Sequence, residues 1–454
     1  MTFYYKISCI STKFTNKFDN FVLDLHYLCT MRVLIVNTSE QTGGAAVAAN
    51  RLMRALNNHG VKVKMLVRDK ETDNINVVGL KNTIFQKWHF LWERLVVYFY
   101  LHFSLKNLFQ IDIANSGADI TRLKEFKEAD VIHLHWINQG MLSLRSIRKI
   151  LASGKPVVWT MHDIWPATAI CHLTLGCNRF KSRCGNCSLL PGKGSADDLS
   201  AKVWRKKERL YNEGDISFVT CSKWLEGEAK KSTLLHDKTI TSIPNAIDTH
   251  VFKQSDKSEA RENCGLPKDK NVILFVCQRL TNPNKGMSYL EEACNIMAKN
   301  HPETLNDTVI AVLGGHADDM KESLPYDIYP LGYTTDINKI VEIYNSASVF
   351  VLPSLSENLP NTIMEAMACG VPCVGFKVGG IPEEIDHGKN GYVAAYRDAE
   401  DLARGIYWVV KEADYEALSK EAHSKVVSSY SQQSVAVKYI EVYNQAIAKK
   451  HYHI

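Results

Sequence analysis

Short apolar runs alternate with amphipathic stretches along almost the entire chain, a pattern typical of repeated β-α units around parallel sheets. The runs that we interpret as buried strands are 33–37, 61–67, 131–135, 157–160, 217–221, 272–277, 309–313, 349–352 and 372–375. A polar segment, 239–270, separates the two sets of runs. The pattern therefore predicts an α/β protein with two Rossmann-like, doubly wound domains. Because ligands bind at the carboxyl ends of parallel strands, two such domains would face each other across a cleft.

The sequence divides into two domains and two terminal segments. We assign residues 31–250 to the first domain and residues 251–430 to the second. Residues 431–454 carry apolar positions every three or four residues, so we expect a helix that crosses back to the first domain. Residues 1–30 lack the apolar block and cleavage site of a signal peptide, and a buried strand begins at Met31. We therefore expect residues 1–30 to be a disordered extension or to result from a mis-assigned start.

Composition excludes several classes of protein, and the uneven distribution of charge has more than one explanation. Hydrophobic residues make up 45% of the 454 residues and charged residues 23%, which excludes collagen-like and wholly disordered chains. No apolar run approaches the roughly 18 residues that cross a bilayer, so we expect a cytoplasmic protein. Residues 31–250 carry 31 Lys and Arg against 20 Asp and Glu, net +11, whereas residues 251–454 carry 20 against 27, net −7. A basic front half suits membrane lipid or nucleic acid, and an ordinary solvated surface explains it equally well.

The segment 353–370 holds the most informative motif. It follows a predicted strand and opens a helix, where Pro360 suits the first turn and the free amides after it can bind phosphate. Glu357 lies before that helix and Glu365 about one turn inside it. Two carboxylates beside an anion site would repel phosphate, so we interpret them as acceptors for sugar hydroxyl groups. Alone, either glutamate would suggest only a helix-start charge or a solvated residue.

Two further elements could contact the same ligand. Arg279 and Lys285 follow the strand 272–277, and two cations there would neutralise a diphosphate. Gly43 and Gly44 follow the first strand, so bare backbone could approach a ligand closely. Taken alone, these cations are ordinary surface charges and the glycine pair is an ordinary tight turn. The chain contains no Asp-x-Asp sequence, so a divalent ion held by two aspartates is not predicted.

Together these segments resemble the retaining glycosyltransferases of family 4, which have the two-domain GT-B fold. The resemblance covers roughly residues 31–450. Its most specific mark is the spacing of Glu357 and Glu365, with Ala-Met-Ala-Cys-Gly after the second glutamate. Supporting marks are Ile-Pro-Asn-Ala-Ile-Asp at 243–248, Gly-Gly-Ile-Pro-Glu at 379–383 and Asn-Gly at 390–391.

The resemblance implies roles for individual residues. Glu365 would hold the nucleotide ribose and Glu357 the donor sugar, in an acceptor-side first domain and a donor-binding second domain. His162 matches the family's histidine near the anomeric centre, although a core histidine is the alternative. The residues expected on this basis are catalytic His162 and Glu357, with donor-binding Gly43, Gly44, Arg279, Lys285, Glu357, Asn358, Leu359, Asn361 and Glu365. Asn358 and Leu359 stand where the family usually has Gly and Phe, which leaves the choice of donor open.

The implied function is that of a hexosyltransferase-type enzyme. It would move a sugar, with retained configuration, from a nucleotide-sugar donor to a polysaccharide or lipid-linked oligosaccharide in cell-surface glycan biosynthesis. Attack on the same face of the sugar, assisted by the departing phosphate, needs no covalent nucleophile and no catalytic cofactor. The alternatives are a sugar-nucleotide epimerase of similar fold and a non-catalytic nucleotide- or nucleic-acid-binding protein. No binding module needs both cations and both glutamates, so we expect no nucleic-acid partner.

Four cysteines fall within seventeen residues, at Cys171, Cys177, Cys184 and Cys187. In a reducing cytoplasm this spacing predicts a structural zinc site, with free thiols or disulfides as the alternatives. Such a site would brace a loop over the acceptor side of the cleft, because it follows His162 by only nine residues.

Residues 84–109 are unusually aromatic for a helical segment. Such a helix could lie in a membrane interface, at the inner face of the membrane, and meet a lipid-linked acceptor. Core helices packed within the first domain are the alternative.

Overall fold

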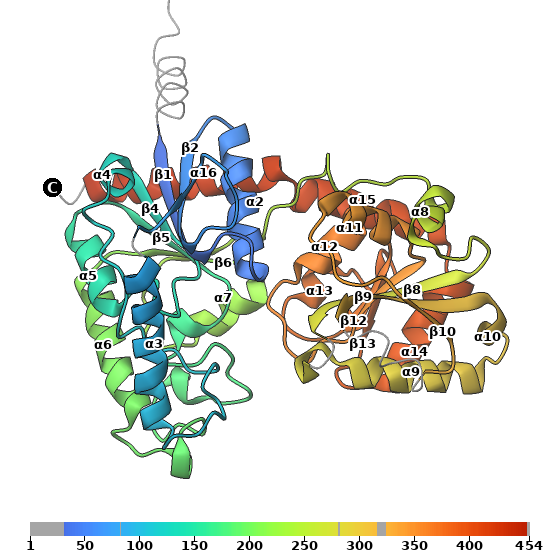
Figure 1. The fold of residues 1–454 in the computed structure, drawn as a ribbon, viewed down its shortest axis with the longest axis horizontal. Coiled ribbons are helices and arrows are strands. Elements are labelled where there is room, and N and C mark those ends of the chain that lie inside the picture. Colours follow the sequence, from blue (N-terminus) through green and yellow to red (C-terminus); the bar gives the residue numbers. More distant parts are fainter. Residues whose placement is uncertain (1–30, 82, 280–281, 316–323, 452–454) are drawn as a thin grey trace, which may run out of the picture.

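The computed structural model describes residues 31–81, 83–279, 282–315 and 324–451, without the side chains of Thr83, Gln278, Arg279 and His451. Within these ranges, two parallel sheets with their helices form two domains that lie side by side (Figure 1). The predicted two-domain α/β fold is therefore confirmed. The expected extension, residues 1–30, lies outside the described residues.

The first sheet has seven parallel strands in the order β3-β2-β1-β4-β5-β6-β7. The strands are β1 (Arg32–Ser39), β2 (Lys62–Asp69), β3 (Val77–Gly79), β4 (Val131–Leu134), β5 (Val157–Met161), β6 (Ser217–Thr220) and β7 (Ile240–Ser242). The helices are α2 (Gly44–Asn58), α3 (Thr83–Tyr100), α4 (Lys124–Glu128), α5 (Leu144–Ala152), α6 (Leu199–Glu213) and α7 (Lys223–Lys230). Along β1, Leu34 and Val36 pack into one apolar cluster while Val33 and Ile35 pack into another, so both faces of the sheet are covered.

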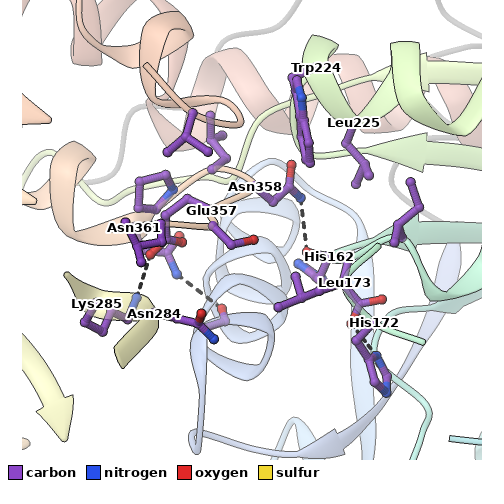
Figure 2. A pocket seen from close by; sticks show the side chains of 18 of the residues that line it. His162, His172, Leu173, Trp224, Leu225, Asn284, Lys285, Glu357, Asn358 and Asn361 are labelled. Carbon is purple, nitrogen blue, oxygen red and sulfur yellow. Dashed lines mark hydrogen bonds and ion pairs between the residues drawn. The ribbon is translucent and has the colours of Figure 1, made fainter. Parts of the chain in front are cut away.

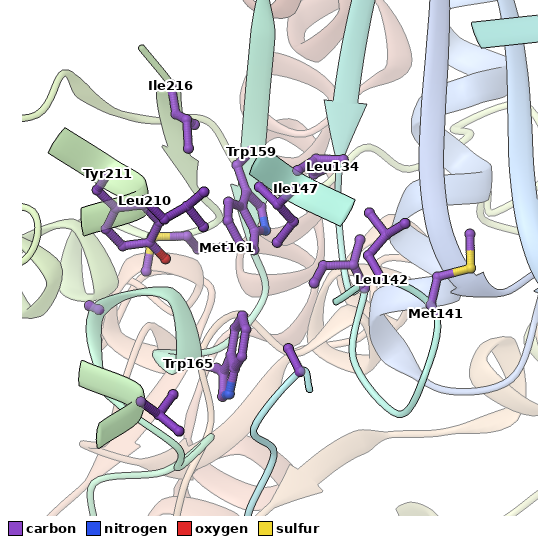
Figure 3. Packing of buried hydrophobic residues seen from close by; sticks show 14 of the residues in the cluster. Leu134, Met141, Leu142, Ile147, Trp159, Met161, Trp165, Leu210, Tyr211 and Ile216 are labelled. Carbon is purple, nitrogen blue, oxygen red and sulfur yellow. The ribbon is translucent and has the colours of Figure 1, made fainter. Parts of the chain in front are cut away.

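Large aromatic side chains form the core beneath one face of this sheet. Trp159 of β5 stacks on Phe218 of β6 with ring centroids 5.9 Å apart, and Tyr211 of α6 meets Trp159 edge-on (Figure 3). Trp165, just after β5, donates its indole N–H to the Asp112 carbonyl at 2.8 Å. This packing fixes the end of β5, from which His162 emerges.

The second sheet has six parallel strands in the order β10-β9-β8-β11-β12-β13. The strands are β8 (Asn271–Arg279), β9 (Thr308–Gly315), β10 (Asp327–Pro330), β11 (Val349–Leu352), β12 (Cys373–Phe376) and β13 (Gly391–Ala394). The helices after the first domain are α8 (Lys257–Cys264), α9 (Met287–Asn300), α10 (Thr304–Asp307), α11 (Ile337–Ser346), α12 (Asn361–Ala368), α13 (Ile381–Glu384), α14 (Ala399–Tyr407), α15 (Tyr415–Ser429) and α16 (Gln432–His451). The polar segment 239–270 thus contains an edge strand and a helix as well as the connection between the domains.

The last helix, α16, runs from the second domain across the first (Figure 1). Its Tyr443 hydroxyl lies 2.8 Å from His133 Nδ1, and its Tyr439 hydroxyl lies 3.0 Å from Thr160 Oγ1. Val435 and Tyr439 join the same apolar cluster as Val33 of β1. The chain therefore links the domains twice. None of the helices in the described ranges is long and apolar enough to span a bilayer.

Candidate functional site

A cavity of 870 Å³ lies between the domains. Its lining comes from segments after β1, β5, β6 and β7 of the first sheet and after β8, β11, β12 and β13 of the second, where ligands of parallel sheets bind. The predicted site residues that line it are Gly44, His162, Lys285, Glu357, Asn358, Leu359, Asn361 and Glu365. Gly43 precedes the lining and caps α2 with φ 92°, a backbone angle that favours glycine. The side chain of Arg279 lies outside the described residues.

Lys285 and Glu357 form an ion pair inside the cavity (Figure 2). The Lys285 Nζ atom lies 2.6 Å from Glu357 Oε1. Gly286, with φ 72°, lets the lysine loop approach β11, because a Cβ there would stand 1.8 Å from the Pro353 carbonyl oxygen. The pair compensates the charge of each side chain. A bound diphosphate would compete for the lysine and so release the carboxylate.

Glu365 is buried and joins the two domains. Its Oε1 atom accepts a hydrogen bond from Arg51 of α2 at 2.6 Å, and its Oε2 atom accepts one from the Tyr344 hydroxyl at 2.8 Å. Arg51 Nη1 is buried without a partner in the described residues. A solvated helix position is therefore excluded for Glu365, whose carboxylate is held rigidly at the cavity wall.

Asn358 and Asn361 also connect the domains (Figure 2). Asn358 accepts a hydrogen bond from the Ser222 hydroxyl at 2.5 Å and donates one to the His162 carbonyl at 3.1 Å. Asn361 donates to the Gly44 carbonyl at 3.2 Å and accepts from Asn245 at 3.0 Å. A ligand in the cavity would therefore contact side chains that already hold the cleft together.

The start of α12 faces the cavity. Pro360 is its N-cap residue and no side chain caps the helix, while Asn361 and Thr362 line the cavity. Uncapped N-terminal amides carry partial positive charge and bind anions. Pro360 thus precedes the first turn instead of lying within it, and this end of α12 can still hold a phosphate group beside Lys285.

The Gly379-Gly380 segment supports the Glu357 loop. Gly379 has φ 58°, and a Cβ there would stand 1.7 Å from the Glu357 carbonyl oxygen. The Gly380 amide donates to the Asn358 carbonyl at 2.7 Å. Glu383 accepts hydrogen bonds from the amides of Lys223 and Trp224 at the start of α7. This segment of the second domain therefore shapes the sugar-side loop and caps a helix of the first domain.

His162 belongs to a buried row of histidines. Its Nε2 atom lies 2.8 Å from Nδ1 of His135, and its Nδ1 atom lies 3.5 Å from the Cys221 sulfur. Burial lowers the pKa of His162 to about 4, so the ring is neutral near pH 7. Both ring nitrogens contact these neighbours, and the backbone carbonyl of His162 accepts the hydrogen bond from Asn358. His162 is thus placed at the cavity wall and is not charged there.

We expect the histidine row to destabilise the fold in acid. Burial lowers the pKa of His133 to about 3 and that of His135 well below its usual value, as for His162. The unfolded chain binds protons on these rings below about pH 6.5, whereas the folded chain does not. Stability is therefore retained above that pH and falls toward pH 4, by up to about 1.4 kcal/mol per pH unit for each histidine.

Denaturant unfolding at pH 7, 6 and 5 would measure this loss, with NMR titration of the three rings in the folded protein as the control. Any of these rings titrating near pH 6.5 in the folded state would contradict the prediction.

A second charged group lies on the first-domain wall. His172 lines the cavity, and its Nδ1 atom lies 2.7 Å from Asp163, whose carboxylate also accepts the Trp136 indole N–H at 3.0 Å. Although burial opposes it, Asp163 and Asp112 raise the pKa of His172 to about 10. The wall therefore holds its charges in compensated pairs.

Several residues of the site were missed by the sequence reasoning. Arg51 lies seven positions after Gly44, and Tyr344 lies on another helix, so neither carries a local signal. Arg397 lines the cavity after β13 with φ 61°, in a segment without a recognisable motif. His172 follows Cys171 directly and lies in no motif that points to the cavity. Contacts between residues far apart in the chain decide the positions of Arg51, Tyr344 and His172.

The four predicted zinc ligands lie close enough for neighbouring thiols to affect each other's pKa. Burial raises the pKa of the Cys171 thiol to about 11 and that of Cys184 to about 12. Across the described residues, no group of three or more His, Cys, Asp or Glu is arranged to hold a metal ion. A zinc site here therefore stays a prediction without support from this geometry. Metal analysis of the reduced protein would decide it.

Two family models match consecutive parts of the chain. Residues 42–251 match the model described as Glycosyltransferase Family 4, and residues 270–412 match the model described as Glycosyl transferases group 1. The first match covers the domain of Gly44 and His162. The second covers the domain of Lys285, Glu357 and Glu365.

Known proteins agree with these matches. A D-inositol 3-phosphate glycosyltransferase 2 of Catenulispora acidiphila is 30% identical over 37% of this chain, which spans 41% of that protein. An uncharacterized glycosyltransferase of Methanocaldococcus jannaschii is 26% identical over 76% of this chain and 91% of its own length. The structure of Anabaena HepE in complex with UDP-glucose has the same fold, with TM-score 0.58 and 16% identity over 93% of this chain and all of that one. The chain thus belongs to the glycosyltransferases, with a family 4 domain followed by a group 1 domain.

Proposed function

We propose that the cavity binds a nucleotide sugar and transfers its sugar, with retained configuration, to a polysaccharide or lipid-linked oligosaccharide. The observation that carries the proposal is the Lys285–Glu357 pair at the uncapped start of α12. One cation and free amides suit a diphosphate, while a carboxylate beside them suits sugar hydroxyl groups. UDP-glucose in the HepE structure supports a donor of this class.

Different residues contact the diphosphate, the sugar and the ribose of the donor. Lys285 and the α12 amides stabilise the negative charge that grows on the diphosphate as the bond to the sugar breaks. Glu357, released from the lysine, accepts hydrogen bonds from the sugar. Glu365 accepts hydrogen bonds from the ribose, while Arg51 and Tyr344 hold its carboxylate in place. The donor is thereby fixed before the acceptor arrives.

The transfer step needs no nucleophilic side chain. The acceptor hydroxyl oxygen forms a bond to the anomeric carbon on the face that the diphosphate leaves, and the bond from that carbon to the phosphate oxygen breaks. The hydroxyl proton passes to the departing phosphate oxygen. His162, which is neutral, shapes this part of the cavity through its carbonyl bond to Asn358. No catalytic cofactor takes part in this scheme.

The acceptor would lie against the first domain. Trp224 and Leu225 at the start of α7, with Leu173, present aromatic and apolar surface to the cavity (Figure 2). Such surface suits the apolar face of a sugar ring. A lipid-linked acceptor stays in a bilayer, so we also propose that the protein works at the inner face of a membrane as a peripheral protein.

A panel of nucleotide sugars tests the proposed function. We expect slow release of nucleoside diphosphate from one donor, increased by a suitable glycan acceptor. Lys285→Ala and Glu365→Ala should abolish the release, whereas Lys270→Ala, a half-buried lysine paired with Asp327 far from the cavity, should preserve it. A panel in which no donor binds would contradict the proposal.

A further inference from the structure

The helix α3 exposes large apolar side chains and buries two charged ones, together with Val97, on its inward side. Its inward side carries Glu93 and Arg94, which are 0% and 6% exposed. The outward side is what we call the α3 apolar face. It consists of Phe85, Trp88, Leu91, Trp92, Leu95 and Phe99, which are between 43% and 64% exposed. Their spacing of three and four residues places them on one side of the helix.

The inward polar residues have structural partners. Glu93 Oε1 accepts hydrogen bonds from the amides of Ile113 and Ala114, and Arg94 Nη1 donates to the carbonyls of Leu108 and Ile111. These bonds fasten the loop after α3 to the helix. They satisfy Glu93 Oε1 and Arg94 Nη1, while Glu93 Oε2 and Arg94 Nη2 are buried without a hydrogen-bond partner in the described residues. The exposed aromatic side chains have no role in the described fold.

Within residues 84–109, the exposed charged side chains are all basic. Glu93 is the one acidic residue in 84–109, and it is buried. Lys87, His102 and Lys106 are exposed in the same segment. The loop after α3 adds Phe103, 63% exposed, to the apolar surface. Aromatic rings bordered by lysines, without exposed carboxylates, match the chemistry of an anionic lipid headgroup region.

We propose that the α3 apolar face is the surface by which this protein docks on an anionic membrane leaflet. The inference rests on the proposed membrane location and not on the proposed sugar transfer. Figure 1 shows α3 on the near side of the first domain, the domain with a net charge of +11 over residues 31–250. That charge complements a negative leaflet, whereas a partner protein would not require it.

The docking face is connected to the acceptor side of the cavity. Arg94 lies 3.5 Å from the Asp112 carboxylate, and Asp112 lies 3.9 Å from His172, which lines the cavity. Trp165 packs against the His172 ring and donates to the Asp112 carbonyl. Docking through α3 would therefore place a rigidly connected wall of the acceptor site close to the bilayer.

Vesicle co-sedimentation of the full chain tests the proposal. We expect binding to vesicles of phosphatidylcholine with phosphatidylglycerol, and weaker binding to phosphatidylcholine alone. A Phe85→Ser, Trp88→Ser, Leu95→Ser variant should reduce the bound fraction by about tenfold or more. The controls are Ile75→Ser, 88% exposed in the same domain, and Tyr333→Ser, 61% exposed in the other. Both should bind like the wild type.

Charge is tested separately, without removing any apolar group. Lys87→Glu with Lys106→Glu should abolish the preference for anionic vesicles, whereas Lys124→Glu, on α4 and 77% exposed, should leave it. Trp88 and Trp92 also provide a signal in the unmodified protein, since their fluorescence should shift to shorter wavelength on anionic vesicles. No shift and no sedimentation would overturn the proposal.

Two other occupants of this face give distinct results. If a second copy covers it, sedimentation velocity will show a dimer that the triple serine variant dissociates, with no vesicle binding. If residues 1–30 make the membrane contact, a variant beginning at Met31 will lose vesicle binding and the triple variant will keep it. Either result would overturn the proposal. Sugar transfer to a soluble acceptor should be unchanged in the triple variant, so failure of docking is distinguishable from failure of the proposed function.

Discussion

Replacing Lys285 with Ala is expected to weaken nucleoside diphosphate binding by roughly 10- to 150-fold, because a hydrogen bond to a charged group contributes about 1.5–3 kcal/mol. Lys285 is the cation that the structure places beside the start of α12, and its loss also leaves Glu357 without its 2.6 Å partner. The unpaired carboxylate would then repel the diphosphate. Equilibrium titration with nucleoside diphosphates measures the effect directly.

Glu357→Gln should act in the opposite direction on the same ligand. Its amide removes the negative charge beside the diphosphate and leaves Lys285 unpaired, so nucleoside diphosphate binding should be unchanged or tighter. Transfer should nevertheless fall by about 100-fold or more, because the charged acceptor for the sugar hydroxyl groups is lost. For the comparison with Lys285→Ala, the control is Lys270→Ala, which also removes a lysine that is paired with a carboxylate. If Glu357→Gln weakened diphosphate binding as much as Lys285→Ala, the assignment of the carboxylate to the sugar would be wrong.

Replacing Glu365 with Ala should abolish transfer and also destabilise the protein. The change leaves the Arg51 guanidinium and the Tyr344 hydroxyl buried without their carboxylate partner, and removing one member of a buried ion pair costs about 3–5 kcal/mol. It also breaks a contact between the domains. Thermal unfolding, measured beside donor titration, would give both effects.

Two milder variants separate stability from ligand binding. Tyr344→Phe removes one hydrogen bond to Glu365 and keeps the carboxylate, so it should lower stability while donor binding persists. Glu365→Gln keeps the side-chain shape but weakens the ribose contact, so donor binding should fall more than stability. If Glu365→Gln lowered stability as much as Tyr344→Phe and left donor binding intact, Glu365 would be a purely structural residue without a ribose role.

The sequence predicted the buried strands well and the edge strands poorly. The nine runs that we interpreted as strands correspond to the central strands of both sheets, where both faces are buried and the apolar run is continuous. The strands that were not predicted, β3, β7, β10 and β13, are the four edge strands of the two sheets. Asp327–Pro330 illustrates the reason, since a short, only partly buried strand carries no continuous apolar signal.

Site residues that lie in a short motif could likewise be predicted, whereas those placed by contacts between distant parts of the chain could not. Lys285 and Glu357 could be found because each lies in a short motif after a strand, and the cavity brings them together. Arg51 could not, because its contact with Glu365 joins residues 314 positions apart. The aromatic segment was equally ambiguous, since periodicity cannot say which side of a helix faces solvent. Three-dimensional packing shows that Glu93 is inside and Trp88 is outside.

The most direct test of the central claim, sugar transfer from a nucleotide donor in this cavity, is a time course by NMR with the donor that the panel identifies. We predict consumption of the donor, equal amounts of nucleoside diphosphate and glycosylated acceptor, and the donor's anomeric configuration in the first product formed. The time course should be flat for Glu365→Ala. A sugar that changes configuration at a ring carbon while it stays attached to the nucleotide would instead identify an epimerase and contradict the account, as would a donor that binds but is never consumed with any acceptor.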